Sequence, residues 1–290
     1  MDNNSNKLHL AYQEAILFAR KHYENFPVVS LLIPKKLRKD VAIIYWFART
    51  ADDIADEGNF SAERRLEMLA RFEKRLQNLL NGIYADKFDL ALAETISEKN
   101  LSPIYFFKLL KAFRSDILFK NFEAFENLLG YCDNSANPIG RLMLELHDIR
   151  DPKVLKLSDN ICTALQLTNF YQDFKDDIKK GRNYLPIKDL AKFGLDENNF
   201  ADPAIRKNLC ETIRFQIERT KGLFLEGEEL LKYLPKNMKI EIAWTILGGR
   251  KIIEKIEAVR CNVLMTRPSL KKYEMIWLLI KSYSYAKRFS

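Results

Sequence analysis

Apolar residues recur at intervals of three and four along most of the chain, which is the pattern of amphipathic α-helices. Small polar residues mark the starts of several segments, as at Ser61, Ser102–Pro103 and Asp202–Pro203. No alternating run bounded by hairpin glycines indicates a β-strand. We predict helices over residues 6–24, 38–57, 61–81, 86–98, 103–118, 121–135, 138–147, 153–179, 203–231, 236–262 and 269–287.

The sequence has no low-complexity linker and no evident repeat, so we expect one all-α domain over residues 1–290. Its 10 glycines are about half the usual share, which also favours helices joined by short turns. The longest apolar runs, Val41–Ala48 and Met275–Ile280, are far shorter than the roughly 20 residues that cross a bilayer. We therefore expect a soluble protein or one bound to a membrane surface.

The charge balance favours an anionic partner. Basic residues number 47 against 39 acidic ones, and the net charge of +8 suits phosphate, a membrane surface or nucleic acid. The basic residues are spread along the chain without a recognition motif, so we expect no nucleic-acid partner. The N-terminal residues lack a secretory apolar segment. We expect a cytoplasmic protein with four reduced cysteines, Cys132, Cys162, Cys210 and Cys261.

The segment over residues 41–57 is apolar around most of its circumference, as a buried helix should be, and yet it carries several carboxylates. At about 100° per residue, one face carries Tyr45, Ala48, Arg49, Asp52 and Asp56, with Asp53 and Glu57 beside it. Buried like charges are costly unless something neutralises them.

A second polar stripe lies on the segment over residues 166–177. One of its faces carries Gln166, Asn169, Asp173 and Asp177, and the opposite face carries Leu167, Tyr171 and Phe174. The turn that follows adds a basic and a phenolic side chain, Arg182 and Tyr184.

Either stripe alone is compatible with a solvated helix face. Acids spaced at i, i+4 repel each other, however, and a solvated face more often alternates its charges. If the two stripes face each other, their carboxylate and amide oxygens form a site suited to Mg²⁺, which takes hard oxygen ligands and usually shares them with phosphate.

The two stripes also resemble known motifs. Asp52-Asp-Ile-Ala-Asp56 resembles the first aspartate-rich motif of the squalene and phytoene synthase family. Asn169-Phe-Tyr-Gln-Asp173 with Asp177, followed by Gly181-Arg-Asn-Tyr-Leu-Pro186, resembles the second, and Tyr131-Cys132 with Gly140 resembles the central segment. The resemblance runs from Tyr12 to Arg267. It implies an all-helical isoprenoid synthase fold with a central cavity.

Within that family the chain is most similar to the hydroxysqualene synthase branch. Gln172 stands where the condensing members usually carry arginine, and Asn137-Pro138 stands where they usually show Ala-Gly. The resemblance implies ionisation of presqualene diphosphate with Mg²⁺, rearrangement of the cation and capture of water to give hydroxysqualene and diphosphate. One departure is Arg260-Cys-Asn-Val263, where the family often has Gly-Tyr-Asp-Val.

The resemblance implies roles for individual residues. Mg²⁺ would be held by Asp52, Asp53, Asp56, Asn169, Asp173 and Asp177. The catalytic set would combine five of these, all but Asp53, with Tyr45 and Arg49. Substrate would contact His22, Ser30, Tyr45, Arg49, Tyr131, Gln166, Arg182, Tyr184 and Arg267. For His22 and Ser30 the alternative is packing or capping, and for Arg267 it is a surface role.

Two other functions stay open. One is a head-to-head condensing synthase that makes presqualene diphosphate, dehydrosqualene or phytoene from prenyl diphosphates such as farnesyl diphosphate. The other is a non-catalytic family member that assembles pathway enzymes, although such a protein would be expected to have eroded motifs. A peripheral membrane contact is a further hypothesis, since Lys35, Lys36, Arg38 and Lys39 adjoin the apolar residues 31–33; the alternative there is a solvated loop.

Overall fold

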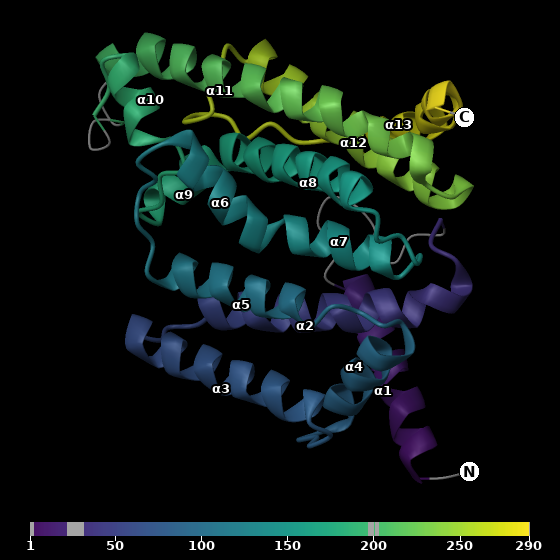
Figure 1. The fold of residues 1–290 in the computed structure, drawn as a ribbon. Helices are drawn as coiled ribbons and strands as arrows, with labels where there is room; N and C mark the ends of the chain where they lie inside the picture. The colour runs from purple at the N-terminus through teal and green to yellow at the C-terminus, as the bar shows by residue number, and fades with distance from the viewer. Residues whose placement is uncertain (1–2, 22–31, 197–199, 201–202, 290) are drawn as a thin grey trace. The chain divides into compact units, whose positions relative to one another are not determined.

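The computed structural model describes residues 3–21, 32–196, 200 and 203–289. The described residues form helices joined by turns, with no strand among them, so the predicted all-α fold class is confirmed (Figure 1). They fall into two compact units, Met1–Leu118 with Pro138–Asp151, and Phe119–Asn137 with Pro152–Ser290. The single domain over residues 1–290 stays a prediction. In the described part of the chain, no helix is long and apolar enough to cross a membrane.

The first unit is built around α2 (Arg38–Asp56), which packs against α1 (Asn3–Lys21), α3 (Ala62–Leu80), α4 (Lys87–Glu98) and α5 (Ile104–Ile117). The short helix η1 (Lys35–Leu37) precedes α2, and α7 (Asn137–Glu145) returns to this unit. At the centre, the Phe47 ring lies 5.1 Å from the rings of both Phe72 and Phe106. Helix α2 is therefore the buried helix that its sequence predicts.

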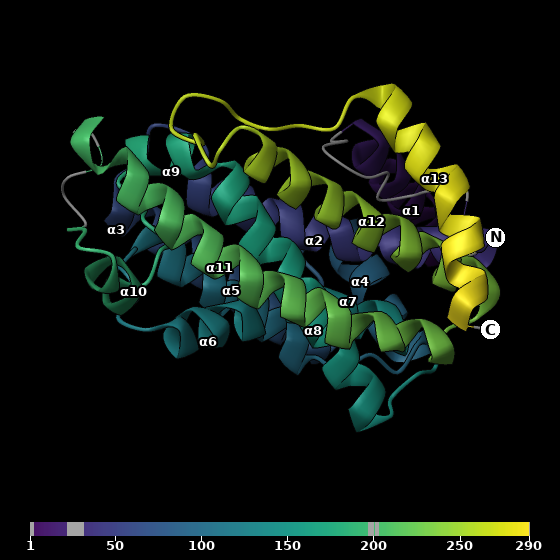
Figure 2. The same ribbon diagram turned by 90° about the horizontal axis from the view of Figure 1, so that it is seen from above.

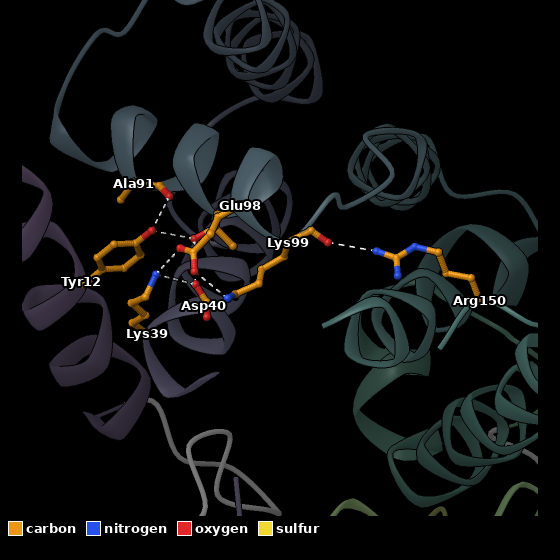
Figure 3. Close-up of polar contacts among 8 residues, drawn as sticks. Tyr12, Lys39, Asp40, Ala91, Glu98, Lys99 and Arg150 are labelled. Atoms are coloured by element: carbon orange, nitrogen blue, oxygen red, sulfur yellow. Dashed lines mark hydrogen bonds and ion pairs between the residues drawn. The ribbon is translucent and has the colours of Figure 1, made fainter. Parts of the chain in front are cut away.

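A polar network joins three helices of this unit around the buried Asp40 (Figure 3). Its Oδ1 accepts from the Thr95 hydroxyl at 3.3 Å and lies 3.1 Å from the Lys39 ammonium. The Tyr12 hydroxyl lies 2.8 Å from Thr95 Oγ1, and Lys39 also donates to Glu98 at 2.8 Å. Burial raises the pKa of Asp40, whereas the hydrogen bond and positive charge of Lys39 oppose this shift by stabilising the ionised carboxylate.

The second unit is built around α8 (Pro152–Gln172), which packs against α6 (Phe125–Ser135), α11 (Arg206–Gly227), α12 (Lys236–Ala258) and η3 (Glu228–Tyr233) (Figure 2). Its smaller elements are α9 (Phe174–Lys179), α10 (Ile187–Lys192), η2 (Pro203–Ile205), α13 (Lys272–Ala286) and η4 (Lys287–Phe289). A Cβ at Gly227 would lie 2.6 Å from the Ile161 side chain, so the approach of α11 to α8 requires glycine there.

Several predicted boundaries are wrong. The single helix expected over residues 153–179 is broken at Asp173, and the one expected over 203–231 is divided into η2, α11 and η3. The helix expected to reach residue 262 ends at Ala258, because Arg260 and Cys261 have φ of 52° and 53°. Helix α10 was not predicted, and the first helix is described only as far as Lys21.

Candidate functional site

The first aspartate motif occupies the last turns of α2, where Arg49 binds its acidic neighbours. The guanidinium lies 2.6 Å from Asp53, 3.3 Å from Asp52 and 2.7 Å from Glu57. The i+3 and i+4 positions of one helix face its residue i, which is why Arg49 reaches Asp52 and Asp53. The predicted polar face of α2 is therefore present, and Arg49 neutralises part of the negative charge of its carboxylates. Asp56 is exposed at the end of the helix.

The end of α2 is fixed by a residue that the sequence patterns did not identify. Arg65 of α3 donates to the backbone carbonyls of Ala55 at 2.7 Å and Gly58 at 2.8 Å. Carboxylates at a helix C-terminus are unfavourable because the unpaired carbonyls there carry partial negative charge. Arg65 offsets this charge and sets the direction of the turn, where Gly58 takes a φ of 83°. It thereby positions the end of the motif.

Three other predicted substrate contacts concern the first unit. Tyr45 is half-buried on α2, with its ring 6.2 Å from that of Phe18 on α1. His22 and Ser30 lie outside the described residues. The structure therefore brings Tyr45, Arg49 and the acidic residues onto one helix.

The second aspartate motif lies at the break between α8 and α9. The Asp173 carbonyl accepts from the backbone N–H of Asp176 at 2.8 Å and of Asp177 at 3.0 Å, which starts α9. The Asp173 carboxylate pairs with Arg267 at 2.5 Å. Asp173 and Asp177 are half-buried, and Asn169 is exposed one turn before Asp173. Arg267, predicted as a substrate contact, is thus a direct partner of the motif.

Gln172 stabilises the break between α8 and α9 through a tertiary hydrogen bond. Its side chain is buried, with 1% exposed, and its Nε2 donates to the Pro268 carbonyl at 2.7 Å. Gln172 and Asp173 therefore bind consecutive residues of the segment between α12 and α13. Asn137, the other residue that departs from the condensing pattern, is also buried and accepts from the Thr163 hydroxyl at 3.0 Å. The side chains of Gln172 and Asn137 therefore both stabilise the fold through buried hydrogen bonds.

The turn after α9 begins at Gly181, whose φ of 74° favours glycine. The backbone N–H of Arg182 donates to the Asp177 carbonyl at 2.9 Å, so the two residues lie close together. The Arg182 side chain is half-buried. Gln166 is also half-buried, on α8.

Tyr131 and Tyr184 meet in an aromatic cluster of the second unit. The Tyr184 ring stacks on Phe170 with centroids 3.7 Å apart, and Tyr131 lies 6.1 Å from Tyr184. Phe119 and Phe122 complete the cluster at 5.1 Å and 6.1 Å from Tyr184. Such rings can stabilise a nearby cation through their electron-rich faces. The sequence analysis identified the two tyrosines and missed the three phenylalanines.

The donors of both motifs are carboxylate and amide oxygens, which are the ligands that Mg²⁺ prefers. Among the described residues, no group of three or more His, Cys, Asp or Glu side chains could hold a metal ion by itself. This is compatible with Mg²⁺, which is commonly held by one or two carboxylates together with substrate phosphates. The donor chemistry of each motif therefore fits the expected metal.

Comparison with known proteins agrees with the motifs. Residues 19–274 match the family model described as squalene/phytoene synthase. The chain is 32% identical to squalene synthase HpnC from Alicyclobacillus acidocaldarius, with a TM-score of 0.82 over 89% of this chain and 99% of that one. It is 30% identical to 15-cis-phytoene synthase of Enterobacter agglomerans, over 80% of each chain. A dehydrosqualene synthase, 23% identical with a TM-score of 0.84 over 99% of this chain and 100% of that one, shares the fold.

Proposed function

The chain belongs to the squalene/phytoene synthase family, and we propose that within this family it is a hydroxysqualene synthase. In this reaction presqualene diphosphate loses diphosphate, the resulting cation rearranges, and water adds to it with loss of a proton. The products are hydroxysqualene and diphosphate. No reductant is consumed.

Gln172 is the observation that carries this proposal. The side chain of Gln172, beside Asp173, is a neutral amide. It is buried, and its Nε2 donates to the Pro268 carbonyl at 2.7 Å. Condensing members handle two diphosphate groups, and the arginine usual at this position offers them a fixed charge for phosphate. Presqualene diphosphate carries only one diphosphate. A buried neutral residue at this position therefore supports its use as the substrate.

The two motifs would divide the work of holding the diphosphate. The metal ligands would be Asp52, Asp53 and Asp56 from α2, and Asn169, Asp173 and Asp177 from the second unit. Bound Mg²⁺ would neutralise the leaving diphosphate. Arg49 and Arg267, which pair with the carboxylates here, would turn to the phosphate oxygens, where a guanidinium makes bidentate contacts. Arg182 would add a third such contact.

The remaining predicted residues would shape the space for the isoprenoid chain. The stacked Tyr184 and Phe170 rings, with Tyr131 beside them, would shield the carbocation from premature capture. Tyr45 and Gln166 would contact substrate from α2 and α8. The same proposal includes His22 and Ser30, which lie outside the described residues.

A condensing synthase is the second candidate, and one observation favours it. Curated relatives are named phytoene synthases, among them the Synechococcus elongatus protein, 27% identical over 89% of this chain and 87% of its own. Such an enzyme would join two prenyl diphosphates. A non-catalytic assembly protein is the third candidate, and it predicts no turnover with either substrate.

One experiment separates the three. The purified protein is incubated with Mg²⁺ and either presqualene diphosphate or farnesyl diphosphate in isotope-labelled water, and the lipids are analysed by mass spectrometry. We expect labelled hydroxysqualene from presqualene diphosphate without NADPH, and no product from farnesyl diphosphate alone. Efficient conversion of farnesyl diphosphate would establish the condensing function instead. Absence of turnover with both would exclude the hydroxysqualene function, and a further incubation with a C20 prenyl diphosphate would then separate phytoene synthesis from the assembly function.

Matched variants test the site. Asp52→Asn and Asp173→Asn should each remove most activity at limiting Mg²⁺ while the helical content stays unchanged. Asp148→Asn is the control, because its side chain is 91% exposed and belongs to neither motif. Mg²⁺ together with a diphosphate analogue should raise the melting temperature by more than the sum of the separate shifts, since each ligand reduces the electrostatic cost of the other. Near-normal turnover in both motif variants would contradict the proposed site.

A further inference from the structure

Helix α13 is apolar on two sides. Its inner side packs on α12 (Figure 2), and Leu278, Tyr285 and Ala286 of α13 are buried. Trp244 of α12 donates from its indole nitrogen to the Met275 carbonyl at 3.0 Å, which fixes the contact further. A helix that is apolar all round is normally buried all round, so its outer side requires a separate explanation.

The outer side carries five large apolar residues that are exposed to solvent, which we call the α13 stripe: Tyr273 (66% exposed), Ile276 (61%), Trp277 (55%), Ile280 (67%) and Tyr283 (49%). Their spacings of three and four place them on one face of the helix. Their exposed area is on the order of 600 Å², at the upper end of the apolar patches found on soluble monomers, where such patches are often functional.

Positive charge surrounds the α13 stripe. Lys271, Lys272 and Lys281 are exposed on α13 or directly before it, and Lys287 and Arg288 are exposed on η4, which follows it. The Lys281 ammonium lies 4.9 Å from the Trp277 ring, and the Lys271 ammonium lies 5.9 Å from the Tyr273 ring.

The single acidic residue of the helix does not offset this charge. Glu274 pairs with Lys255 of α12 at 2.6 Å and also accepts from the backbone N–H of Lys271 at 2.7 Å. Its side chain is only 15% exposed. The face that meets solvent is therefore apolar at its centre and basic at its rim.

We infer that the α13 stripe docks on a lipid bilayer that contains anionic headgroups. Tryptophan and tyrosine are the residues that favour the boundary between headgroups and acyl chains, and isoleucine adds apolar burial below it. Lysines beside such a stripe meet the lipid phosphates, each contributing through the negative surface potential. The basic rim and the aromatic centre together match this environment, and the inference does not depend on which reaction the enzyme catalyses.

A second copy of the chain fits the α13 stripe less well. Two copies related by a two-fold axis would bring their basic rims together, with Glu274 already paired to Lys255. Charge complementarity therefore favours the lipid surface.

The membrane contact hypothesised at Lys35, Lys36, Arg38 and Lys39 has a less exposed apolar part than the α13 stripe. There Ile33 and Leu37 are buried, with 6% and 4% exposed. Lys39 is engaged by Asp40 and Glu98 (Figure 3). Of the apolar residues 31–33, Ile33 is buried, Leu32 is half-buried and Leu31 lies outside the described residues, whereas the five residues of the α13 stripe are exposed.

Vesicle binding by the full chain tests the inference. The protein is sedimented with vesicles of phosphatidylcholine alone or mixed with an equal amount of phosphatidylglycerol, over a range of salt concentrations. We expect binding to the anionic vesicles, weakened by salt, together with a blue shift of tryptophan emission. Trp277→Phe should keep most of the binding and lose most of the shift, because Trp244 is buried and Trp46 is half-buried.

Ile276→Ser with Ile280→Ser should weaken binding by at least about tenfold, because two exposed apolar side chains no longer enter the bilayer. Leu225→Ser is the matched control, since Leu225 is 64% exposed on α11 and should bind as the wild type does. Circular dichroism should show the same helical content for all three proteins, because these side chains are exposed.

Two results would overturn the inference. One is binding of the double variant equal to that of Leu225→Ser. The other is no binding of the wild type to anionic vesicles; if light scattering then showed a dimer that the double variant dissociates, the α13 stripe would be a contact between copies.

Discussion

Replacing Gln172 by leucine removes one hydrogen bond from the second motif while keeping an apolar side chain of similar size. The amide is 1% exposed and donates to the Pro268 carbonyl at 2.7 Å. Such a bond contributes about 1 kcal/mol net on average, but deletion of one partner that leaves a buried carbonyl without its donor costs about 1–3 kcal/mol instead. Leucine recovers part of this through its own burial. We expect a loss of about 2 kcal/mol in the free energy of unfolding.

The adjacent ion pair adds little to this figure. Arg267 and Asp173 have side chains that are 45% and 34% exposed, and pairs of this kind contribute about 0–1 kcal/mol. The loosened segment should nevertheless shift Arg267 away from Asp173, so kcat/KM should fall with the stability. Gln172→Arg should be more damaging than Gln172→Leu, because it places a larger, charged group in a buried position.

Urea unfolding followed by circular dichroism measures the effect, since the midpoint should fall without a change in slope. Thr168→Val is the matched control on the same helix. Thr168 is also buried, but its hydroxyl donates only to the Ala164 carbonyl one turn earlier, at 2.7 Å. Equal stabilities for Gln172→Leu and Thr168→Val would refute the role given to the Pro268 contact.

Three further predictions concern the first unit. Lys39 lowers the pKa of Glu98 to about 2 from 4.5, so Glu98 contributes stability above about pH 4.5 that is lost as the pH falls toward 2; solvent screening at 43% exposure limits this to about 1 kcal/mol. Urea unfolding of Glu98→Gln at pH 7 and pH 3 should show that loss at pH 7 and less of it at pH 3, whereas exposed Glu94→Gln should show neither. Arg65→Met should cost about 2 kcal/mol, because α2 loses the donor to its last carbonyls, and wild-type kcat/KM would contradict its positioning role. Ser61→Ala should lower the free energy of unfolding by about 1 kcal/mol, since Ser61 caps α3; an unchanged urea midpoint would contradict the cap.

Helix periodicity predicted nearly all of the longer helices, because their burial pattern is local information. The break at Asp173 was not predicted, for an equally physical reason. Its supports, Arg267 and Pro268, lie 94 and 96 positions away from Asp173 and Gln172. The pattern over residues 153–179 is continuous, and only the tertiary contact shows where the helix stops.

In the candidate site too, local contacts could be predicted from the sequence and tertiary contacts could not. Arg49 could be placed beside Asp52 and Asp53 from the sequence, because residues three and four apart share a helix face. Arg65 could not, since its partners are backbone carbonyls, which no side-chain pattern marks. The aromatic cluster was foreseen only in its two tyrosines, because four separate segments supply its rings and composition does not say which of the phenylalanines meet them.

Both aspartate motifs are paired with arginine in this structure, and this pairing bears on the proposed reaction. Arg49 binds the first motif from its own helix, and Arg267 binds the second from a distant segment. Arginine keeps its charge at any physiological pH, so a divalent cation must compete with it for the carboxylates. A diphosphate that accepts the displaced guanidinium removes the cost of that competition. The pairing thus provides a physical reason for metal and substrate to bind together.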